Sequence, residues 1–280
     1  MHMVTNRKNI GARIAKYAVL VFFALLILFP IYMVISGSFK SLFELYDNIF
    51  GLPESFKLDN YVKAFVDGHL KEYYLNSFIV TGSSLLLLTF LGSMGGFALT
   101  RLGLKMSKPI YYLFVIGISI PTQVGIVQLA LQMSKMRLMN SLFGLIMVHT
   151  AYELPFTIFI FYGFMEEIQW DLQEAAVIDG CSQFQLYWNI MLPLCRSAVA
   201  TCLIFNMVTI WNDMLFPLIL ISKEKLRTLP YGLLMFSGQH GSQYTIIFAG
   251  VIIITLPLTI LYLFLQKQFM EGLTSGAVKG

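Results

Sequence analysis

The side chains that could do chemistry are few, and most of them interrupt long apolar runs. His149 and Glu153 stand four residues apart in one run, and Asn212 and Asp213 follow Trp211 directly in another. Residues i and i+4 of a helix lie on the same face, so His149 and Glu153 can pair with each other. Polar groups within apolar spans are costly and often mark the path of an ion or a solute.

A solute path built from such groups would suit a sugar. Sugar hydroxyls need hydrogen-bonding groups, which Gln128 and Gln132 could supply from one helix face, and an aromatic platform, which Trp211 or Tyr152 could supply. The competing interpretation is that the same polar groups satisfy one another or fix how two helices pack. The residues alone leave both interpretations open.

The sequence lacks the motifs of an enzyme or an ATPase. It contains no Gly-Lys pair, and therefore no phosphate-binding loop, and neither a His-Glu-x-x-His nor a Gly-x-Ser-x-Gly sequence. The histidines are scattered, and Cys181, Cys195 and Cys202 have no metal-binding or redox spacing. We therefore expect no catalytic residue, no metal site and no cofactor bound by this chain. ATP-driven work would need a separate subunit.

The composition indicates an integral membrane protein. Hydrophobic residues make up 57% of the chain and charged residues 12%, against roughly a quarter charged in globular proteins. The mean hydropathy is +0.73, so most of the chain must lie in lipid or in a helical bundle. The net charge of +4 is spread out, and no basic run is present that would bind nucleic acid.

Apolar runs predict six transmembrane helices in an all-α membrane protein that forms a single domain over residues 1–280. One of them contains Gly92 and Gly96, a spacing that lets a second helix backbone approach closely. The predicted spans cover about residues 17–36, 75–99, 110–133, 142–165, 198–221 and 244–265.

The distribution of lysine and arginine predicts that both termini are cytoplasmic. Positive charge near short cytoplasmic ends sets orientation, and an even number of spans places both ends on one side. Lysines and arginines divide almost equally between the two sides, so the prediction rests on two short segments. These are the acid-free N-terminal tail and the turn after the second run, with Arg7, Lys8, Arg13 and Lys16, and Arg101, Lys105 and Lys108.

Residues 166–197 form a polar interruption between the fourth and fifth runs. Helix formers with early acids predict one short helix, and Gly180 is a natural C-terminal stop. A second short helix should follow and end at Pro193, with one apolar face made of Phe184, Tyr187, Trp188 and Met191. On this pattern alone, the segment could be an amphipathic hairpin that merely connects two spans.

The residue spacing in the 166–197 segment resembles the EAA signature of bacterial ABC-importer permeases. Seven positions match it: Glu174, Ala175, Ala176, Gly180, Ile190, Leu192 and Pro193. The resemblance implies a type I ABC importer fold with a cytoplasmic coupling helix that docks into a separate ATPase. The residues it assigns to ATPase coupling are those seven and Asp179.

Further residues resemble the carbohydrate-uptake branch of that family, and within it the maltose-type second permease. They include Trp211-Asn212-Asp213, Leu229-Pro230 and the tail Gly272–Gly280, of which Gly276, Val278 and Lys279 would contact the ATPase. The resemblance implies a multi-pass protein of the bacterial plasma (inner) membrane. Its implied partners are a second permease in a heterodimer, two ATPase subunits that bind ATP and Mg²⁺, an extracytoplasmic sugar-binding protein, a sugar substrate and membrane lipid.

The alternative is a proton-coupled secondary transporter or channel that uses the His149–Glu153 pair. Such proteins usually show internal repeats and broken helices near the membrane midplane, and the sequence shows no defensible repeat.

Overall fold

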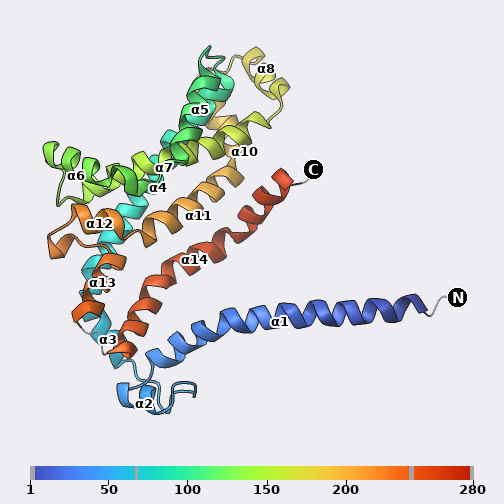
Figure 1. The fold of residues 1–280 in the computed structure, drawn as a ribbon. Helices are drawn as coiled ribbons and strands as arrows, with labels where there is room; N and C mark the ends of the chain where they lie inside the picture. The colour runs from blue at the N-terminus through green and yellow to red at the C-terminus, as the bar shows by residue number, and fades with distance from the viewer. Residues whose placement is uncertain (1–3, 67–68, 240–242, 278–280) are drawn as a thin grey trace. The chain divides into compact units, whose positions relative to one another are not determined.

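The computed structural model of the protein describes residues 4–66, 69–239 and 243–277, and every regular element in those ranges is a helix (Figure 1). The chain divides into two compact units, which are described separately below. Unit 1 comprises Met1–Leu70 and Leu233–Ile254, and unit 2 comprises Lys71–Gly232 and Thr255–Gly280. The boundary between them falls inside helices.

Unit 1 carries the first apolar helix and the polar stretch that follows it. Its elements are α1 (Val4–Ser38), α2 (Leu42–Asp47), α3 (Asp59–Val66), most of α13 (Leu229–Gln239) and the first part of α14 (Tyr244–Ala277). The ammonium of Lys40 is fully buried and donates to the carbonyls of Asn48 and Gly51, both at 2.7 Å. Asn60 donates from its amide to the carbonyls of Ser38 and Lys40. These bonds hold the turn after α1 in place.

Unit 2 is organised around α7 (Leu142–Glu166), which packs against α4, α5, α11 and α12. The close approach of α4 to α7 occurs at the predicted glycines. A Cβ on Gly96 would lie 2.7 Å from the Cβ of Phe161 and 3.1 Å from the backbone nitrogen of Tyr162. Glycine is therefore required for this helix contact, as the sequence predicts. The remaining elements before α13 are α4 (Leu70–Arg101), α5 (Ser107–Ile118), η1 (Thr122–Gly125), α6 (Ile126–Lys135), α8 (Trp170–Ile178), α9 (Gln183–Gln185), η2 (Leu186–Met191), α10 (Leu192–Leu194), α11 (Arg196–Asn212), α12 (Leu215–Leu220) and η3 (Glu224–Leu226).

Four described helices are long and apolar enough to cross a membrane: Gly11–Ser38, Leu70–Arg101, Leu142–Glu166 and Tyr244–Lys267. Each contains one of the predicted stretches 17–36, 75–99, 142–165 and 244–265. Two bent pairs raise the number of candidate spans to six if each pair counts as one. They are Ser107–Ile118 with Thr122–Lys135, bent by 89°, and Gln183–Leu194 with Arg196–Asn212, bent by 72°.

The predicted span over 110–133 is not one continuous helix in the structure, because α5 ends before Pro121. Proline has no backbone N–H, and it disfavours the helical conformation of the residue before it, here Ile120. Pro121 itself is extended, with ψ 131°, and the short 3₁₀ helix η1 follows it. The break turns α6 away from the direction of α5.

The predicted span over 198–221 is also broken in the structure, at the Asn212-Asp213 pair that interrupts its apolar run. α11 ends at Asn212, and Asp213 is extended, with ψ 129°. The Asp213 carboxylate accepts the backbone N–H groups of Leu215 at 3.0 Å and Phe216 at 3.1 Å, and so caps the start of α12. A side chain that satisfies free N–H groups in this way favours a new helix start over continuation of the old helix.

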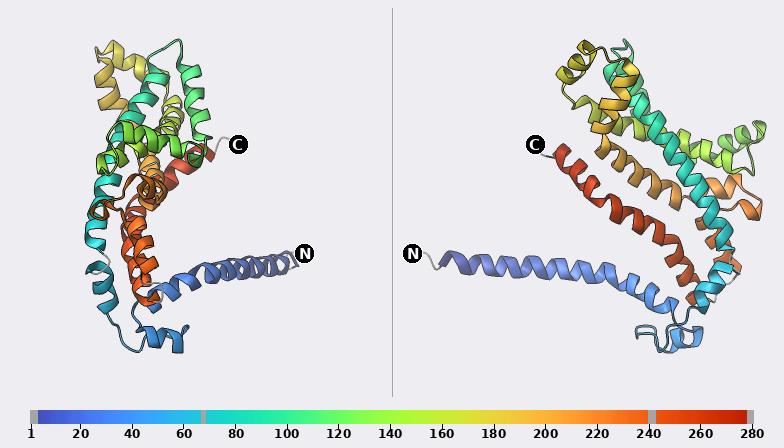
Figure 2. Two further views of the ribbon diagram at one scale, coloured as in Figure 1. Left: turned by 60° about the vertical axis from the view of Figure 1, so that its left-hand side comes forward. Right: turned by 180° about the vertical axis from the view of Figure 1, so that it is seen from behind.

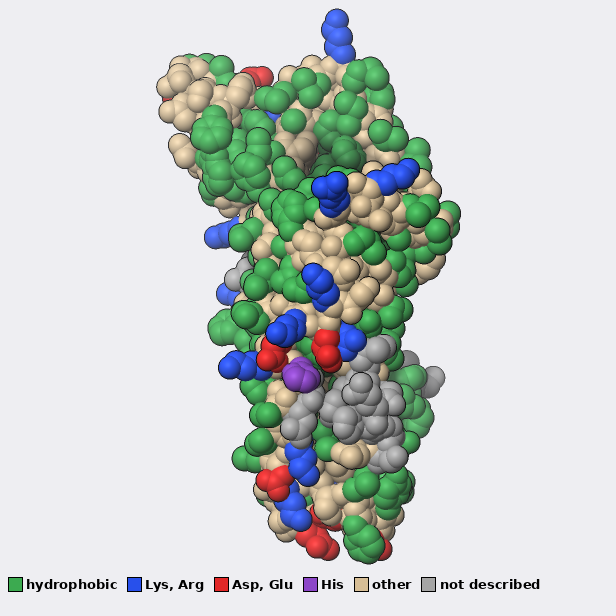
Figure 3. All heavy atoms as spheres, turned by 90° about the vertical axis from the view of Figure 1, so that its left-hand side faces the viewer, with side chains coloured by type: hydrophobic (Ala, Val, Ile, Leu, Met, Phe, Trp, Pro, Cys, Tyr) green, Lys and Arg blue, Asp and Glu red, His purple; other side chains and the backbone are tan. Residues whose placement is uncertain are grey.

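The long helices leave apolar side chains uncovered. On α1, which runs as one uninterrupted helix (Figure 2), Phe22, Leu26 and Phe29 are all more than half exposed. Hydrophobic side chains spread over much of the face drawn in Figure 3. Water-soluble monomers rarely expose apolar patches on this scale, so these surfaces require lipid or protein neighbours.

Candidate functional site

The first half of the 166–197 segment is a helix closed by a glycine turn. α8 carries Glu174, Ala175 and Ala176 and ends at Ile178, and Gly180 stands two residues further on with φ +83°. The N–H of Cys181 donates to the carbonyl of Ala176, and that of Gly180 to the carbonyl of Val177, both at 3.0 Å. This is the Schellman pattern, which needs a left-handed residue. The predicted glycine stop is confirmed.

The second half of the segment contains a π-helical turn, so the predicted apolar face is only partly formed. Tyr187 and Met191 are buried, whereas Phe184 is 66% exposed and Trp188 40% exposed. α9, η2 and α10 follow one another without a gap over residues 183–194, and Pro193 lies inside this run. Pro193 cannot donate to the carbonyl four residues earlier, and a wider π turn accommodates that missing bond.

Pro193 does not end the helical run, contrary to the prediction. The run continues to Leu194, and the 72° bend to α11 comes at Cys195. The start of the run is set by Ser182 and Gln185, whose side chains each accept the backbone N–H of the other residue. This reciprocal capping box satisfies two donors that the helix start leaves free.

Most of the residues assigned to coupling by resemblance lie on the outside of the segment. Glu174, Ala175, Asp179, Gly180 and Pro193 are exposed. Ile190 and Leu192 are half-buried, and Ala176 is buried. Between these positions lie exposed apolar side chains, of which Ile178 is 85% exposed. The surface therefore combines a free carboxylate with small and apolar groups, a composition suited to a protein partner.

Arg101, the last residue of α4, forms hydrogen bonds to the backbone where the 166–197 segment begins, which we call the base of the segment. Its side chain is 3% exposed, and its Nη2 donates to the carbonyls of Met165 and of Ile168, the latter at 2.6 Å. The guanidinium also lies 4.6 Å from the ring centroid of Trp170. A cation at carbonyls near the C-terminal end of α7 is electrostatically favourable. The sequence suggested only a charge at the membrane edge; it gave no sign of these contacts.

The inner face of the segment is fixed to α4 and α7. The Tyr187 hydroxyl lies 2.7 Å from the Ser93 hydroxyl, and the Tyr187 ring centroid lies 5.5 Å from that of Phe97. Around them is an apolar cluster that includes Phe161 and Met165 of α7. The inner face of the segment is therefore packed directly against α4 and α7.

The structure brings only some of the predicted substrate-path residues together, namely His149, Glu153 and Asp213. His149 is 2% exposed, and its Nε2 lies 3.7 Å from Oδ2 of Asp213, so the structure pairs it with Asp213 and not with Glu153. Trp211 is 1% exposed and packs edge-on against Tyr74 and Phe78, which excludes it as an open platform. Gln128, Gln132 and Asn212 are exposed, the first two on α6.

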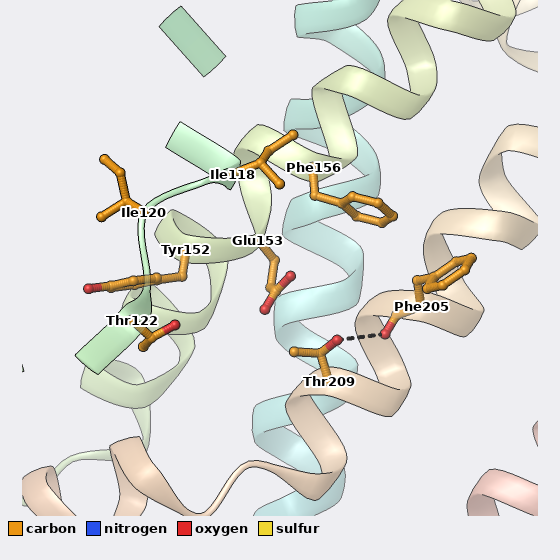
Figure 4. Close-up of a pocket in the computed structure, with 8 residues that line it drawn as sticks. All are labelled: Ile118, Ile120, Thr122, Tyr152, Glu153, Phe156, Phe205 and Thr209. Atoms are coloured by element: carbon orange, nitrogen blue, oxygen red, sulfur yellow. Dashed lines mark hydrogen bonds between the residues drawn. The ribbon is translucent and has the colours of Figure 1, made fainter. Parts of the chain in front are cut away.

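Glu153 and Tyr152 instead line a cavity of ≈ 240 Å³ between α5, η1, α7 and α11. Figure 4 shows the Glu153 carboxylate directed into this space, toward the side of α11 that carries Thr209. The Thr209 hydroxyl donates to the carbonyl of Phe205 at 3.0 Å. The other residues lining the cavity are Ile118, Ile120, Thr122 and Phe156. Of these eight residues, the sequence singled out Glu153 and Tyr152.

The residues predicted to contact the ATPase from the tail fall at the end of α14 and beyond it. Gly276 belongs to α14, whereas Val278 and Lys279 lie outside the described residues.

Comparison with known proteins places this architecture among transport proteins. The chain is 36% identical over 256 residues to the probable starch degradation products transport system permease protein AmyC of Thermoanaerobacterium thermosulfurigenes, over 91% of this chain and 93% of that protein. It is 33% identical over 271 residues to the multiple sugar-binding transport system permease protein MsmG of Streptococcus mutans, over 94% and 96% respectively.

A solved structure shares the fold. A chain in the crystal structure of a bacterial ABC transporter involved in the import of the acidic polysaccharide alginate matches with a TM-score of 0.82 and 21% identity. The match covers 96% of this chain and 99% of that one. A family model described as "Binding-protein-dependent transport system inner membrane component" matches residues 88–274, which is more than half of the chain. The chain belongs to this family, and is thus the membrane permease of a binding-protein-dependent importer and not an enzyme.

Proposed function

We propose that the chain is one of two different permease subunits of an ATP-driven sugar importer, and that residues 166–197 couple it to a separate ATPase. Support for the substrate class comes from the relatives, whose names specify starch degradation products and multiple sugars. A third relative, the melibiose/raffinose/stachyose import permease protein MelC of Bacillus subtilis, is 31% identical over 252 residues.

The observation that carries the coupling proposal is the construction of the 166–197 segment. Its outer surface presents Glu174 and Ala175, and its base is held by Arg101 and by the Tyr187–Ser93 hydrogen bond. A carboxylate can form strong hydrogen bonds with an arginine or lysine of a partner, and alanine allows close approach. Because the base of the segment is rigidly held, a partner that moves the outer surface would also move α4 and α7. Packed elements often switch between two discrete arrangements in this way.

The proposed arrangement in the membrane has six spans, a single permease domain over residues 1–280 and both termini in the cytoplasm. The two bent pairs each count as one span in this arrangement, and the 166–197 segment then lies on the cytoplasmic side. ATP and Mg²⁺ bind the two ATPase subunits, while this chain binds no cofactor. A sugar-binding protein delivers the substrate from outside. A bacterial alginate ABC transporter with a chain of similar fold has been crystallised in complex with an alginate pentasaccharide-bound periplasmic protein.

Two smaller assignments belong to the proposal. The tail residues Gly276, Val278 and Lys279 contact the ATPase, and Glu153 lies on the substrate path. The remaining predicted path residues fall into two groups. Three contribute through helix packing: His149, Asp213 and Trp211. Two lie on exposed faces: Asn212 and Gln128.

The test is a crosslink from position 174 in the assembled transporter. In a Cys181→Ser background, Glu174→Cys should crosslink to the ATPase subunit and should resist membrane-impermeant thiol reagents added outside cells. The matched control is Glu224→Cys in η3, another exposed carboxylate, which should react from outside and give no ATPase crosslink. External labelling at 174 or an ATPase crosslink at 224 would refute the proposed arrangement.

A further inference from the structure

The cavity between α5, α7 and α11 lies where the helical backbone is interrupted. α5 stops at Ile118, and η1 begins only at Thr122, after an 89° change of direction. Pro155 in the middle of α7 also removes one helical hydrogen bond beside the cavity. Non-helical backbone within a membrane is tolerated where it is buried in protein or lines a water-filled space. Residues 119–121 are exposed in this structure, so the break is not buried within this chain and is compatible with a water-filled space beside it.

The walls of this cavity combine one carboxyl group, hydroxyls and aromatic rings. Glu153, Thr122 and Thr209 contribute oxygen atoms, and Tyr152, Phe156 and Phe205 contribute rings. Phe205 and Thr209 are themselves exposed on α11, so this side of the cavity is open. Oxygen atoms that hydrogen-bond hydroxyls, beside rings that cover the apolar C–H faces of a sugar, are a suitable set for a carbohydrate ring.

The size and charge of the cavity narrow the class of ligand. Its volume of ≈ 240 Å³ is below the roughly 300–1,000 Å³ of pockets that enclose a drug-sized ligand, so it suits one ring of a longer chain. None of the eight described lining residues is a lysine, arginine or histidine. A uronate carboxylate would find no countercharge there, and it would face the carboxyl group of Glu153. Neutral hydroxyls would find an acceptor.

We propose that this cavity is a sugar subsite of the permease, in which Glu153 and Thr209 hydrogen-bond one neutral sugar ring of an oligosaccharide and acidic sugars are disfavoured. This inference rests on the proposed sugar importer and specifies the substrate class at one site of it. All eight residues that line the cavity belong to this chain.

The experiment uses the complete transporter, with both permeases, both ATPases and the binding protein, in proteoliposomes supplied with ATP. Uptake of three neutral trisaccharides (maltotriose, raffinose and cellotriose) is compared with uptake of the acidic trigalacturonate. The variants are Glu153→Gln and Thr209→Val. The matched control is Thr259→Val on α14, an exposed threonine away from the cavity whose hydroxyl also donates to the carbonyl four residues earlier, at 3.0 Å.

The wild type should import at least one neutral trisaccharide in preference to trigalacturonate. Because the binding protein captures the sugar first, loss of a permease contact should appear in the maximal rate. Glu153→Gln should lower that rate about tenfold, as expected when a neutral hydrogen bond replaces a charge-assisted one, and Thr209→Val about threefold, as expected when one neutral hydrogen bond is lost. Thr259→Val should match the wild type, and rates are normalised to assembled complex, so a folding defect is not counted.

Other outcomes separate the subsite from the function it rests on. ATP-dependent import of a neutral sugar with both cavity variants equal to Thr259→Val would overturn the subsite and leave the sugar importer standing. Preferential import of trigalacturonate that falls in both cavity variants but not in Thr259→Val would show that the cavity takes an acidic sugar, and would overturn the subsite as proposed. Absence of any ATP-dependent sugar uptake by the wild type, both with these four sugars and with melibiose, stachyose and arabinooligosaccharides, the sugars named for relatives, would refute the proposed importer, and the subsite with it.

Discussion

Gly180 holds a backbone conformation that other residues adopt only at a cost. Its φ is +83°, and no described atom of another part of the chain lies within 4 Å of the position a Cβ would take. A Cβ at this position would therefore meet no steric clash, and the effect of Gly180→Ala is confined to backbone strain of roughly 1–2 kcal/mol. We expect this strain to open the Schellman turn and to lower uptake about tenfold. Transport assays and thermal unfolding of the purified complex measure the two effects.

Gly103 provides the matched control for Gly180. It has φ +62° and equally open surroundings, but it lies in the turn between α4 and α5. Gly103→Ala should cause similar backbone strain and leave uptake near wild type. Gly180→Asn should retain more uptake than Gly180→Ala, because asparagine tolerates the left-handed region better than alanine does. Equal losses of uptake in Gly103→Ala and Gly180→Ala would argue against a special role for the turn at Gly180.

The sequence predicts residues whose structural role depends on local backbone geometry. Gly180 is foreseeable because a helix end needs a left-handed residue, and Gly96 because its spacing from Gly92 marks a close helix contact. Arg101 and Glu153 are different. The carbonyls that Arg101 binds lie 64 and 67 residues further along the chain. The cavity around Glu153 depends on a bend in another helix, and no local spacing encodes either arrangement.

The π-helical turn in the second half of the 166–197 segment, over Leu186–Met191, depends on one proline. Pro193→Ala would restore the missing N–H and allow regular α-helix through residues 183–194. Removing the π turn shifts preceding residues by one position, or about 100° around the helix axis. The Tyr187 hydroxyl would then move out of hydrogen-bonding distance of the Ser93 hydroxyl. The Met191 side chain, now 1% exposed, would move to the surface. In a Cys181→Ser background, Met191→Cys should be protected from thiol reagents, and adding Pro193→Ala should make it reactive.

Phe184→Cys is the control for that measurement, because Phe184 is already 66% exposed and should react with or without Pro193. Continued protection of Met191→Cys in the Pro193→Ala background would show that the π turn has another cause. The two broken spans have the same kind of origin. Pro121 and the capping carboxylate of Asp213 are visible in the sequence, yet apolar periodicity on both sides hides the break that each one causes.

At the scale of the whole molecule, the remaining question is the source of energy for transport. A proton-coupled mechanism would need a titratable pair that changes partners during the cycle. The His149–Glu153 pair foreseen for that purpose is replaced in the structure by His149 and Asp213. The Asp213 carboxylate also accepts two backbone N–H groups at the start of α12, which gives it a structural role in capping. These contacts favour a fixed helix junction over a proton carrier.

We therefore expect uptake to follow ATP and to ignore the proton gradient. In proteoliposomes of the complete transporter, sugar uptake should require ATP on the side that bears residues 166–197 and should persist when a protonophore is added. His149→Gln, which removes the titratable ring but retains hydrogen-bonding groups, should keep the same ATP dependence even if assembly falls. Uptake driven by an imposed proton gradient without ATP, and lost in His149→Gln, would establish the proton-coupled alternative. We expect this because the surface of the 166–197 segment that carries Glu174 and Ala175 is exposed and can bind an ATPase. The His149 side chain is buried and cannot exchange protons directly with water.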